Sequence, residues 1–275
     1  MIWMSAASVQ QTDATAHAKA DSVLLRLLDV NLAFRETTVL KDIRMEMRAG
    51  EFISVIGPSG CGKTSLLRVL AGLYSPTDGK AIYANRELNG PQADIAVVFQ
   101  DYAKALLPWR TAYGNVSLSL EAMKVPKAER PDIIHDLLAK TGLAAHADKF
   151  PNQMSGGMQQ RLQIARCLAQ KPKLLLMDEP FGALDAMTRQ GLQDELLSIL
   201  AASGAAAFFV THDLEEAIYL SDRVVGLLPH PGRVSEVFDV NIQRPRHQLE
   251  TRETAEFIHL RRELNRFIAA AEGAH

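Results

Sequence analysis

Short apolar runs separated by turn residues fill the chain from Val23 to about Phe99. Runs with the length and flanking residues of β-strands are Leu24–Val30, Phe52–Ile56, Lys80–Ala84 and Ile95–Phe99. One helix is expected among them, over Thr64–Ala71, because its leucines recur on one face and Gly72 follows as a stop signal.

The pattern changes over residues 101–170, which we predict to be mainly helical. Prolines interrupt this stretch at four points: Pro108, Pro126, Pro131 and Pro151. A helix is expected to begin near Pro131 and to end at Gly142, in keeping with the preference for proline at a helix start and glycine at its end.

Strand and helix alternate again from Lys173 onward. The expected strands are Lys173–Met177, Ala205–Thr211 and Arg223–Leu228, and the expected helices are Thr188–Ala202 and Leu214–Leu220. These strands are continuous apolar runs, which is typical of a sheet covered on both faces. Beyond Pro231 we expect a short strand and an amphipathic helix that carries Phe257, Leu260, Leu264 and Phe267.

These elements predict one α/β domain interrupted by a helical insertion. We place an unstructured tail at residues 1–22, the main domain at 23–240 with its insertion at about 101–170, and a helical extension at 241–275. The 275 residues are 47% hydrophobic, enough to bury a sizeable core.

Composition excludes several classes of protein. The formal charge of −2 argues against a broad basic face for nucleic acid, so we expect no nucleic-acid partner. The two cysteines, Cys61 and Cys167, form no pair that indicates a disulfide framework or a zinc site. No apolar run approaches the roughly 20 residues that span a bilayer, and the N-terminus does not read as a signal peptide. We therefore expect a cytoplasmic protein.

A phosphate-binding motif lies between the second predicted strand and the first predicted helix. It reads Gly57-Pro58-Ser59-Gly60-Cys61-Gly62-Lys63-Thr64, followed by Ser65, and matches GxxxxGK[ST]. Glycines let backbone N–H groups turn toward phosphate oxygens, Lys63 adds a positive charge, and the Thr64 hydroxyl is a ligand suited to Mg²⁺. A glycine-rich turn with a surface lysine is the alternative, and the complete match in this setting disfavours it. We expect Cys61 to fill space in the loop.

Two carboxylates and a histidine follow later strands. Asp178 and Glu179 end the run that begins at Lys173, which points Asp178 toward Mg²⁺ and Glu179 toward an attacking water. An acidic turn is the alternative. His212 follows the strand Ala205–Thr211, and Asp213 is a candidate helix cap. A lone histidine is usually structural, but this one is expected at the same sheet edge.

A second glycine turn occurs at Met154-Ser155-Gly156-Gly157-Met158-Gln159-Gln160-Arg161. Ser155 is a good N-cap, and the two glycines at a helix start form another anion-binding turn. One polypeptide hardly needs two phosphate cradles for one nucleotide. We infer that this turn closes on a nucleotide held by a second copy.

At these residues the sequence resembles the ATP-binding subunits of ABC transporters, from Val23 to about Pro231. Ser155-Gly156-Gly157 with Gln159-Gln160-Arg161 resembles the signature motif of that family, although Met154 and Met158 replace its usual leucine and glutamine or glutamate. Gln100 matches the Q-loop, Ala183-Leu184-Asp185 the D-loop and His212 the switch histidine. Phe34 matches an aromatic that stacks on adenine, with a core phenylalanine as the alternative.

The resemblance implies a P-loop NTPase core of the ABC ATPase type, with an inserted helical subdomain and an antiparallel β portion near the N-terminus. It implies ATP and Mg²⁺ as cofactors, with Glu179, His212 and Gln100 as catalytic residues and Thr64, Gln100 and Asp178 near the metal. Residues implied to contact the nucleotide are Phe34, residues 57–65, Ser155, Gly156, Gly157 and Asp185.

The resemblance also implies partners. Two copies would sandwich two Mg-ATP molecules, most simply as a homodimer, and drive transmembrane permease subunits fed indirectly by an extracytoplasmic solute-binding protein. The chain would sit peripherally on the cytoplasmic face of the inner membrane. Leu106-Leu107-Pro108-Trp109-Arg110 with Asn115-Val116, and Phe181 to Ala186, resemble nitrate, sulfonate and taurine importer ATPases.

Other classes of function stay open at this point. A soluble ABC ATPase acting on DNA or ribosomes usually carries a long coiled-coil insertion or two tandem cassettes, and neither occurs here. An ABC ATPase for another solute is a further alternative. A GTPase or small-molecule kinase would share the phosphate loop, but no NKxD-type tetrapeptide occurs and the second glycine turn would be unexplained. A purely structural role would make the special residues coincidental.

Overall fold

A computed structural model describes residues 22–182 and 184–273, without the side chains of residues 102 and 103. Apart from Ser22, the predicted N-terminal tail lies outside the described residues, as does Ala183 of the D-loop match.

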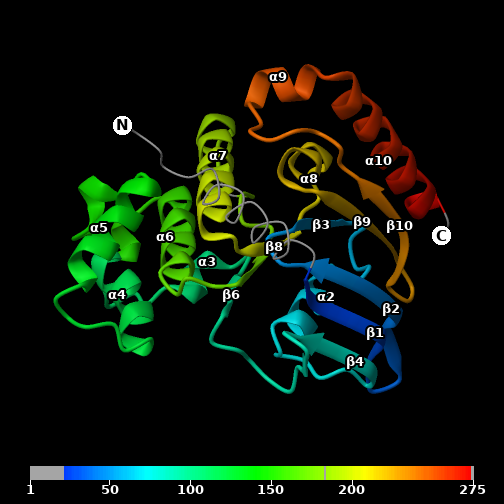
Figure 1. Cartoon of the computed structure of the whole chain (residues 1–275), viewed down its shortest axis with the longest axis horizontal. Coiled ribbons are helices and arrows are strands. Elements are labelled where there is room, and N and C mark those ends of the chain that lie inside the picture. The colour runs from blue at the N-terminus through cyan, green and yellow to red at the C-terminus, as the bar shows by residue number, and fades with distance from the viewer. Residues whose placement is uncertain (1–21, 183, 274–275) are drawn as a thin grey trace, which may run out of the picture.

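A six-stranded sheet forms the centre of the molecule (Figure 1). Its order is β10 (Arg233–Asp239), β9 (Arg223–Leu228), β3 (Phe52–Ile56), β8 (Ala206–Val210), β7 (Leu174–Asp178) and β6 (Ile95–Val98). The strands from β9 to β6 are parallel, and β10 pairs antiparallel with β9. Because β3, β7 and β8 are buried along their whole length, their continuous apolar runs are explained by cover on both faces.

A four-stranded antiparallel sheet lies on one side of this centre, in the order β2 (Thr37–Arg48), β1 (Val23–Phe34), β4 (Asp78–Tyr83) and β5 (Arg86–Glu87). The antiparallel portion is confirmed, but the predicted strands omitted β2. Its signal is the alternation Ile43, Met45, Met47, all buried, with charged residues between them. The α2 helix (Lys63–Leu70) buries its leucines in the core that both sheets share.

A second core lies on the other face of the six-stranded sheet. It is covered by the helical insertion and by α7 (Ala186–Ser203), α8 (Leu214–Leu220) and the C-terminal helices. The insertion consists of α3 (Tyr102–Ala105), α4 (Ala112–Ala122), α5 (Arg130–Lys140), η1 (Ala144–His146), η2 (Pro151–Gln153) and α6 (Gly156–Leu168). It extends from the β6 edge of the sheet, away from α2 (Figure 1).

The chain ends in α9 (Gln248–Glu253) and α10 (Ala255–Gly273), which curve over α8 and β10 (Figure 1). The predicted amphipathic helix is confirmed, since Phe257, Leu260, Leu264 and Phe267 are buried. Among the described residues, no helix is both long and apolar enough to cross a membrane.

Candidate functional site

The phosphate loop, residues 57–64, leads from β3 into α2. Gly57 and Gly62 have φ values of +155° and +93°, in the region that favours glycine. A Cβ on Gly57 would lie 2.5 Å from the carbonyl oxygen of Leu227, and one on Gly62 would lie 2.7 Å from the Leu40 side chain. These two glycines keep the loop close to its neighbours, so that the first N–H groups of α2 present an anion-binding end.

The ammonium group of Lys63 lies inside this loop. Nζ donates to the carbonyl oxygens of Gly57, at 2.7 Å, and Pro58, at 3.0 Å. These bonds hold a positive charge beside the N-terminus of α2, where it would attract the negative charge of a polyphosphate. The Cys61 thiol is buried, and burial raises its pKa, which fits the expected space-filling role and not a nucleophile.

Asp178, at the end of β7, meets Thr64 of α2. The Thr64 hydroxyl donates to Oδ1 of Asp178 at 3.2 Å. Burial raises the pKa of the Asp178 carboxyl, so a divalent cation beside it would be favoured because its charge offsets the lost hydration. Hydroxyl and carboxylate oxygens suit Mg²⁺, which needs only one or two protein ligands alongside phosphate. Within the described ranges, no three His, Cys, Asp or Glu residues gather as a metal cage.

Glu179 directly follows β7 and has an unusual backbone. Its φ is +47°, in the left-handed region that costs a residue with a Cβ on the order of 1 kcal/mol. Its N–H donates to the carbonyl oxygen of Val210 on the neighbouring strand β8, at 2.9 Å. This bond fixes the turn that directs the Glu179 side chain out of the sheet edge, beside Asp178.

Gln100 and His212 both contact the Glu179 carboxylate. Nε2 of Gln100 donates to Oε2 at 3.0 Å, and Nδ1 of His212 lies 3.4 Å from Oε1. The His212 side chain is 70% exposed, so this histidine is not a core residue. The parallel sheet explains the meeting, because the carboxyl ends of β6, β7 and β8 share one edge.

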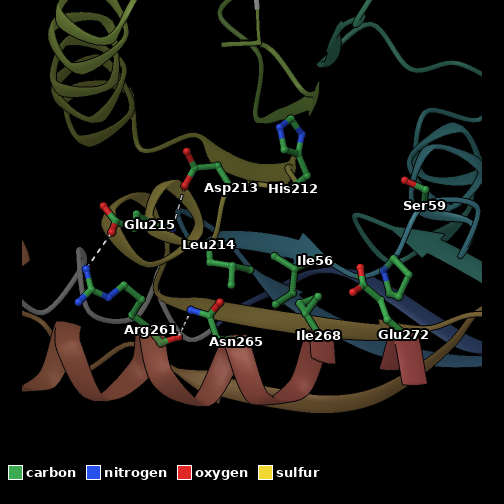
Figure 2. A pocket seen from close by; sticks show the side chains of 12 residues that line it. Ile56, Ser59, His212, Asp213, Leu214, Glu215, Arg261, Asn265, Ile268 and Glu272 are labelled. Carbon is green, nitrogen blue, oxygen red and sulfur yellow. Dashed lines mark hydrogen bonds and ion pairs between the residues drawn. The ribbon is translucent and has the colours of Figure 1, made fainter. Parts of the chain in front are cut away.

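Two pockets flank these groups. One, of ≈ 350 Å³, is lined in part by Thr64, Gln100 and Asp178. The other, of ≈ 570 Å³, lies between the phosphate loop, the turn at His212 and helix α10, as Figure 2 shows. The carboxyl edge of the sheet therefore has a pocket on each side of the phosphate loop, into which a ligand could bind.

Phe34 ends β1 and is 45% exposed, which excludes the alternative of a core phenylalanine. Its ring forms a T-shaped pair with the Tyr74 ring, at a centroid distance of 5.2 Å. An exposed ring face held by an edge contact is suited to stacking on a flat ligand.

The second glycine turn is separate from this cluster. Ser155 is exposed and caps α6, accepting a hydrogen bond from the N–H of Met158 at 3.3 Å. Across the part of the chain that the structure describes, no hydrogen bond or ion pair joins Ser155–Gly157 to the phosphate loop. Figure 1 shows α6 in the helical insertion and α2 on the other side of the sheet.

Asp185 and Leu184 lie next to the second turn. Asp185 caps α7, accepting from the N–H of Thr188 at 3.0 Å, and this bond lowers the pKa of its exposed carboxyl. A Cβ on Gly157 would lie 2.8 Å from Cδ2 of Leu184, so the signature and D-loop matches share one surface.

Sequence reasoning missed a buried network behind the site. Glu216 of α8 is 5% exposed and accepts hydrogen bonds from Thr211 and Gln193, with Arg189 nearby. Two features signal it: Glu216 falls in the first turn of an apolar helix, and Gln193 lies on the inner face of α7. Neither feature shows which residue the buried side chain would contact.

Comparisons with known proteins agree with this geometry. The sequence model of the ABC transporter family matches residues 40–182, more than half of the chain. The chain belongs to the ABC transporter ATP-binding family. Nitrate import ATP-binding protein NrtC of Synechococcus elongatus is 48% identical over 83% of this chain, and bicarbonate transport ATP-binding protein CmpC of the same species is 45% identical over 85%. The chain spans 35% of the length of each.

Nitrate transport protein NasD of Klebsiella oxytoca is 42% identical over 85% of this ABC ATPase and 90% of its own length. A solved dimer of an ATP-binding cassette in a post-hydrolysis state, bound to ADP and phosphate, superposes with a TM-score of 0.71. It is 31% identical and covers 79% of this chain and 99% of its own. The P-loop NTPase fold with its helical insertion and antiparallel sheet is thereby confirmed, and so are ATP binding and ATP hydrolysis.

Proposed function

We propose that this ABC ATPase powers import of a small oxyanion by hydrolysing Mg-ATP between two copies of the chain. One observation supports this proposal most directly: the candidate catalytic and metal-binding side chains meet at one sheet edge, whereas Ser155–Gly157 lies apart from them. The side chains at the edge are Lys63, Thr64, Gln100, Asp178, Glu179 and His212. The relatives named for nitrate and bicarbonate transport support the class of solute. Sulfonates and taurine stay within the proposal as oxyanionic solutes.

The roles within one half-site follow from the contacts. Lys63 and the N–H groups of residues 57–65 hold the phosphates, and Phe34 stacks on the adenine. Thr64, Asp178 and Gln100 would hold Mg²⁺, which would supply positive charge to neutralise the phosphates. Glu179 accepts the proton of the attacking water, and His212 orients the γ-phosphate.

The second half-site comes from the other copy. Ser155, Gly156 and Gly157 of that copy would meet the γ-phosphate, with Asp185 beside them. The triphosphate then bridges two surfaces, and its hydrolysis removes the bridge, so ATP binding closes the pair and hydrolysis opens it. A homodimer is the simplest such pair, and the solved cassette, which is a dimer, supports it.

A preformed loop in the insertion offers a surface for the permease. Trp109 is 71% exposed, so it is not a packing residue. Asn115 is fully buried: its Oδ1 accepts from the N–H of Leu107, and its Nδ2 donates to the carbonyl oxygens of Leu107, Arg110 and Thr111. This bracing holds Trp109 on a rigid loop, as an aromatic anchor at an interface requires. We place the permease on residues 100–116.

We infer that the chain works on the cytoplasmic face of the inner membrane through this permease, with an extracytoplasmic binding protein delivering the solute to it. The test is reconstitution of the chain in proteoliposomes with a permease and a solute-binding protein for a small oxyanion. We expect nitrate or another small oxyanion to stimulate ATP hydrolysis. Stimulation by a sugar or peptide alone would contradict the solute class, and hydrolysis insensitive to any permease would contradict the transport role.

A further inference from the structure

A partly buried chain of contacts connects the second glycine turn to the switch histidine within one copy. It starts where Gly157 packs against Leu184. The carbonyl oxygen of Leu184 accepts a hydrogen bond from the Arg189 guanidinium at 3.1 Å. Any shift of the turn at Leu184 therefore changes the position of the Arg189 side chain.

Arg189 continues the chain of contacts to the turn that carries His212. Nη1 lies 3.6 Å from a carboxylate oxygen of Asp213, and Nε lies 3.7 Å from Oε1 of Glu216. Nε is buried and has no hydrogen-bond partner among the described residues, so the Glu216 carboxylate is its electrostatic anchor, while Asp213 attracts the exposed part of the guanidinium.

Glu216 and Asp213 together fix the backbone on either side of His212. Glu216 accepts from the Thr211 hydroxyl at 2.9 Å, and that hydroxyl accepts from the N–H of Asp213 at 3.0 Å. Asp213 in turn caps α8 by accepting from the N–H groups of Glu215 and Glu216. His212 thus sits between two residues whose positions depend on the same network.

We propose that Arg189 and Glu216 are positioning residues that couple the turn at Leu184 and Asp185 to His212. The inference rests on the proposed two-copy site, in which Ser155–Gly157 and the adjoining Leu184–Asp185 face the other copy's nucleotide. Closure on that nucleotide presses on Leu184, and Arg189 and Glu216 transmit the displacement to His212, 3.4 Å from the Glu179 carboxylate. Each copy's hydrolysis then depends on its contact with the nucleotide of its partner.

The test measures steady-state ATP hydrolysis by Arg189→Ala. We expect kcat to fall about tenfold with the KM for ATP unchanged, because the phosphate loop is intact while His212 is misplaced. Arg189→Lys should recover part of the loss by restoring the charge. A fall in kcat of less than twofold, or a rise in KM alone, overturns the proposal.

A double-mutant cycle separates positioning from general damage. In the His212→Ala background, measured by single turnover, Arg189→Ala should cause no further loss, because its effect acts through that histidine. Losses that multiply overturn the proposal while leaving the two-copy site in place. Loss of ATP-dependent pairing in wild type would instead remove the proposed function itself.

A matched control lies at the other end of the central sheet, away from the carboxyl ends of its strands. Arg223, at the start of β9, forms an ion pair with the buried Glu51 at 2.6 Å. Arg223→Ala removes a similar charge pair without touching the path to Leu184, and we expect its kcat to stay within twofold of wild type. An equal loss of kcat in both variants means that any general weakening of the fold lowers activity, which overturns the proposal.

Discussion

The phosphate-loop edge (Lys63, Thr64, Gln100, Asp178, Glu179 and His212) and the second glycine turn (Ser155–Gly157) use the same physical device in different surroundings. Both place a glycine turn and free N–H groups at the start of a helix. At the edge, Lys63 is held by carbonyl oxygens of its own loop, and the other side chains contact partners from other elements of the same chain. At the turn, the exposed serine caps its own helix and reaches nothing else that the described residues offer. This difference is what the proposed two-copy site requires, in which one copy carries two unequal half-sites.

The largest loss of ATP hydrolysis is expected from removing the positive charge of the phosphate loop. Lys63→Ala deletes the ammonium that Gly57 and Pro58 hold in the loop. We expect ATP hydrolysis to fall by about 10³-fold or more, as for loss of a principal electrostatic group. Steady-state turnover with Mg-ATP measures it. Unchanged turnover would refute the assignment of the loop.

A charge reversal at the turn should be nearly as damaging without harming the fold. Ser155→Asp keeps a good N-cap for α6 but places a carboxylate where the partner's γ-phosphate is expected. We expect hydrolysis to fall about 10²-fold from electrostatic repulsion while binding of ATP to the single chain is unchanged.

Ser155→Asn is the matched control, because asparagine caps the helix without a charge. It should retain most activity, and thermal unfolding should show all three proteins equally stable. Weaker ATP binding by the single Ser155→Asp chain would place the turn in the chain's own site and erase the distinction between the two half-sites.

The smallest expected effect is on stability and not on activity, and it concerns the buried side chain of Glu216. Burial raises the pKa of Glu216 to about 7, and the charge of Asp213 adds to this, while the Thr211 hydrogen bond and the charges of Arg189 and His212 oppose it. Gln193 of α7 is its remaining polar neighbour. The folded chain therefore keeps a proton on Glu216 that the unfolded chain releases near pH 4.5.

Between these two pH values the folded state binds more protons, so its stability falls as pH rises. Relative to Glu216→Gln, which cannot ionise, wild type should lose on the order of 3 kcal/mol from about pH 4.5 to about pH 7 and little beyond. Urea unfolding at a series of pH values measures the difference. Parallel pH profiles for the two proteins would contradict the buried state of this carboxylate.

The sequence was most informative where the chemistry is contiguous. The phosphate loop is one run of eight residues, and the strands that end at Asp178 and before His212 are unbroken apolar runs. Parallel-sheet topology then requires their ends to meet, so this edge could be predicted. The strand β2 was missed although Ile43, Met45 and Met47 alternate with charged residues, because the exposed pair Lys41 and Asp42 interrupts the alternation earlier in the strand.

Contacts between distant segments could not be predicted from one sequence. The contacts of Glu216 with Arg189 and Gln193, and of Gly157 with Leu184, depend on how α7 and α8 pack and on where the insertion ends. Periodicity indicates that such positions are buried, but it does not give the partner. The left-handed backbone of Glu179 has no local signal either, because the bond to Val210 fixes it.

The most direct test of the two-copy site is the solution mass of Glu179→Gln with Mg-ATP, measured by sedimentation velocity. Removing the carboxylate proposed to receive the proton should slow hydrolysis by about 10²- to 10⁴-fold, so that the triphosphate proposed to bridge the two copies persists. We predict a stable dimer that returns to monomer when Ser155→Asp is added to the same chain. A Glu179→Gln chain that stays monomeric with bound ATP, or a dimer indifferent to Ser155→Asp, would contradict the account.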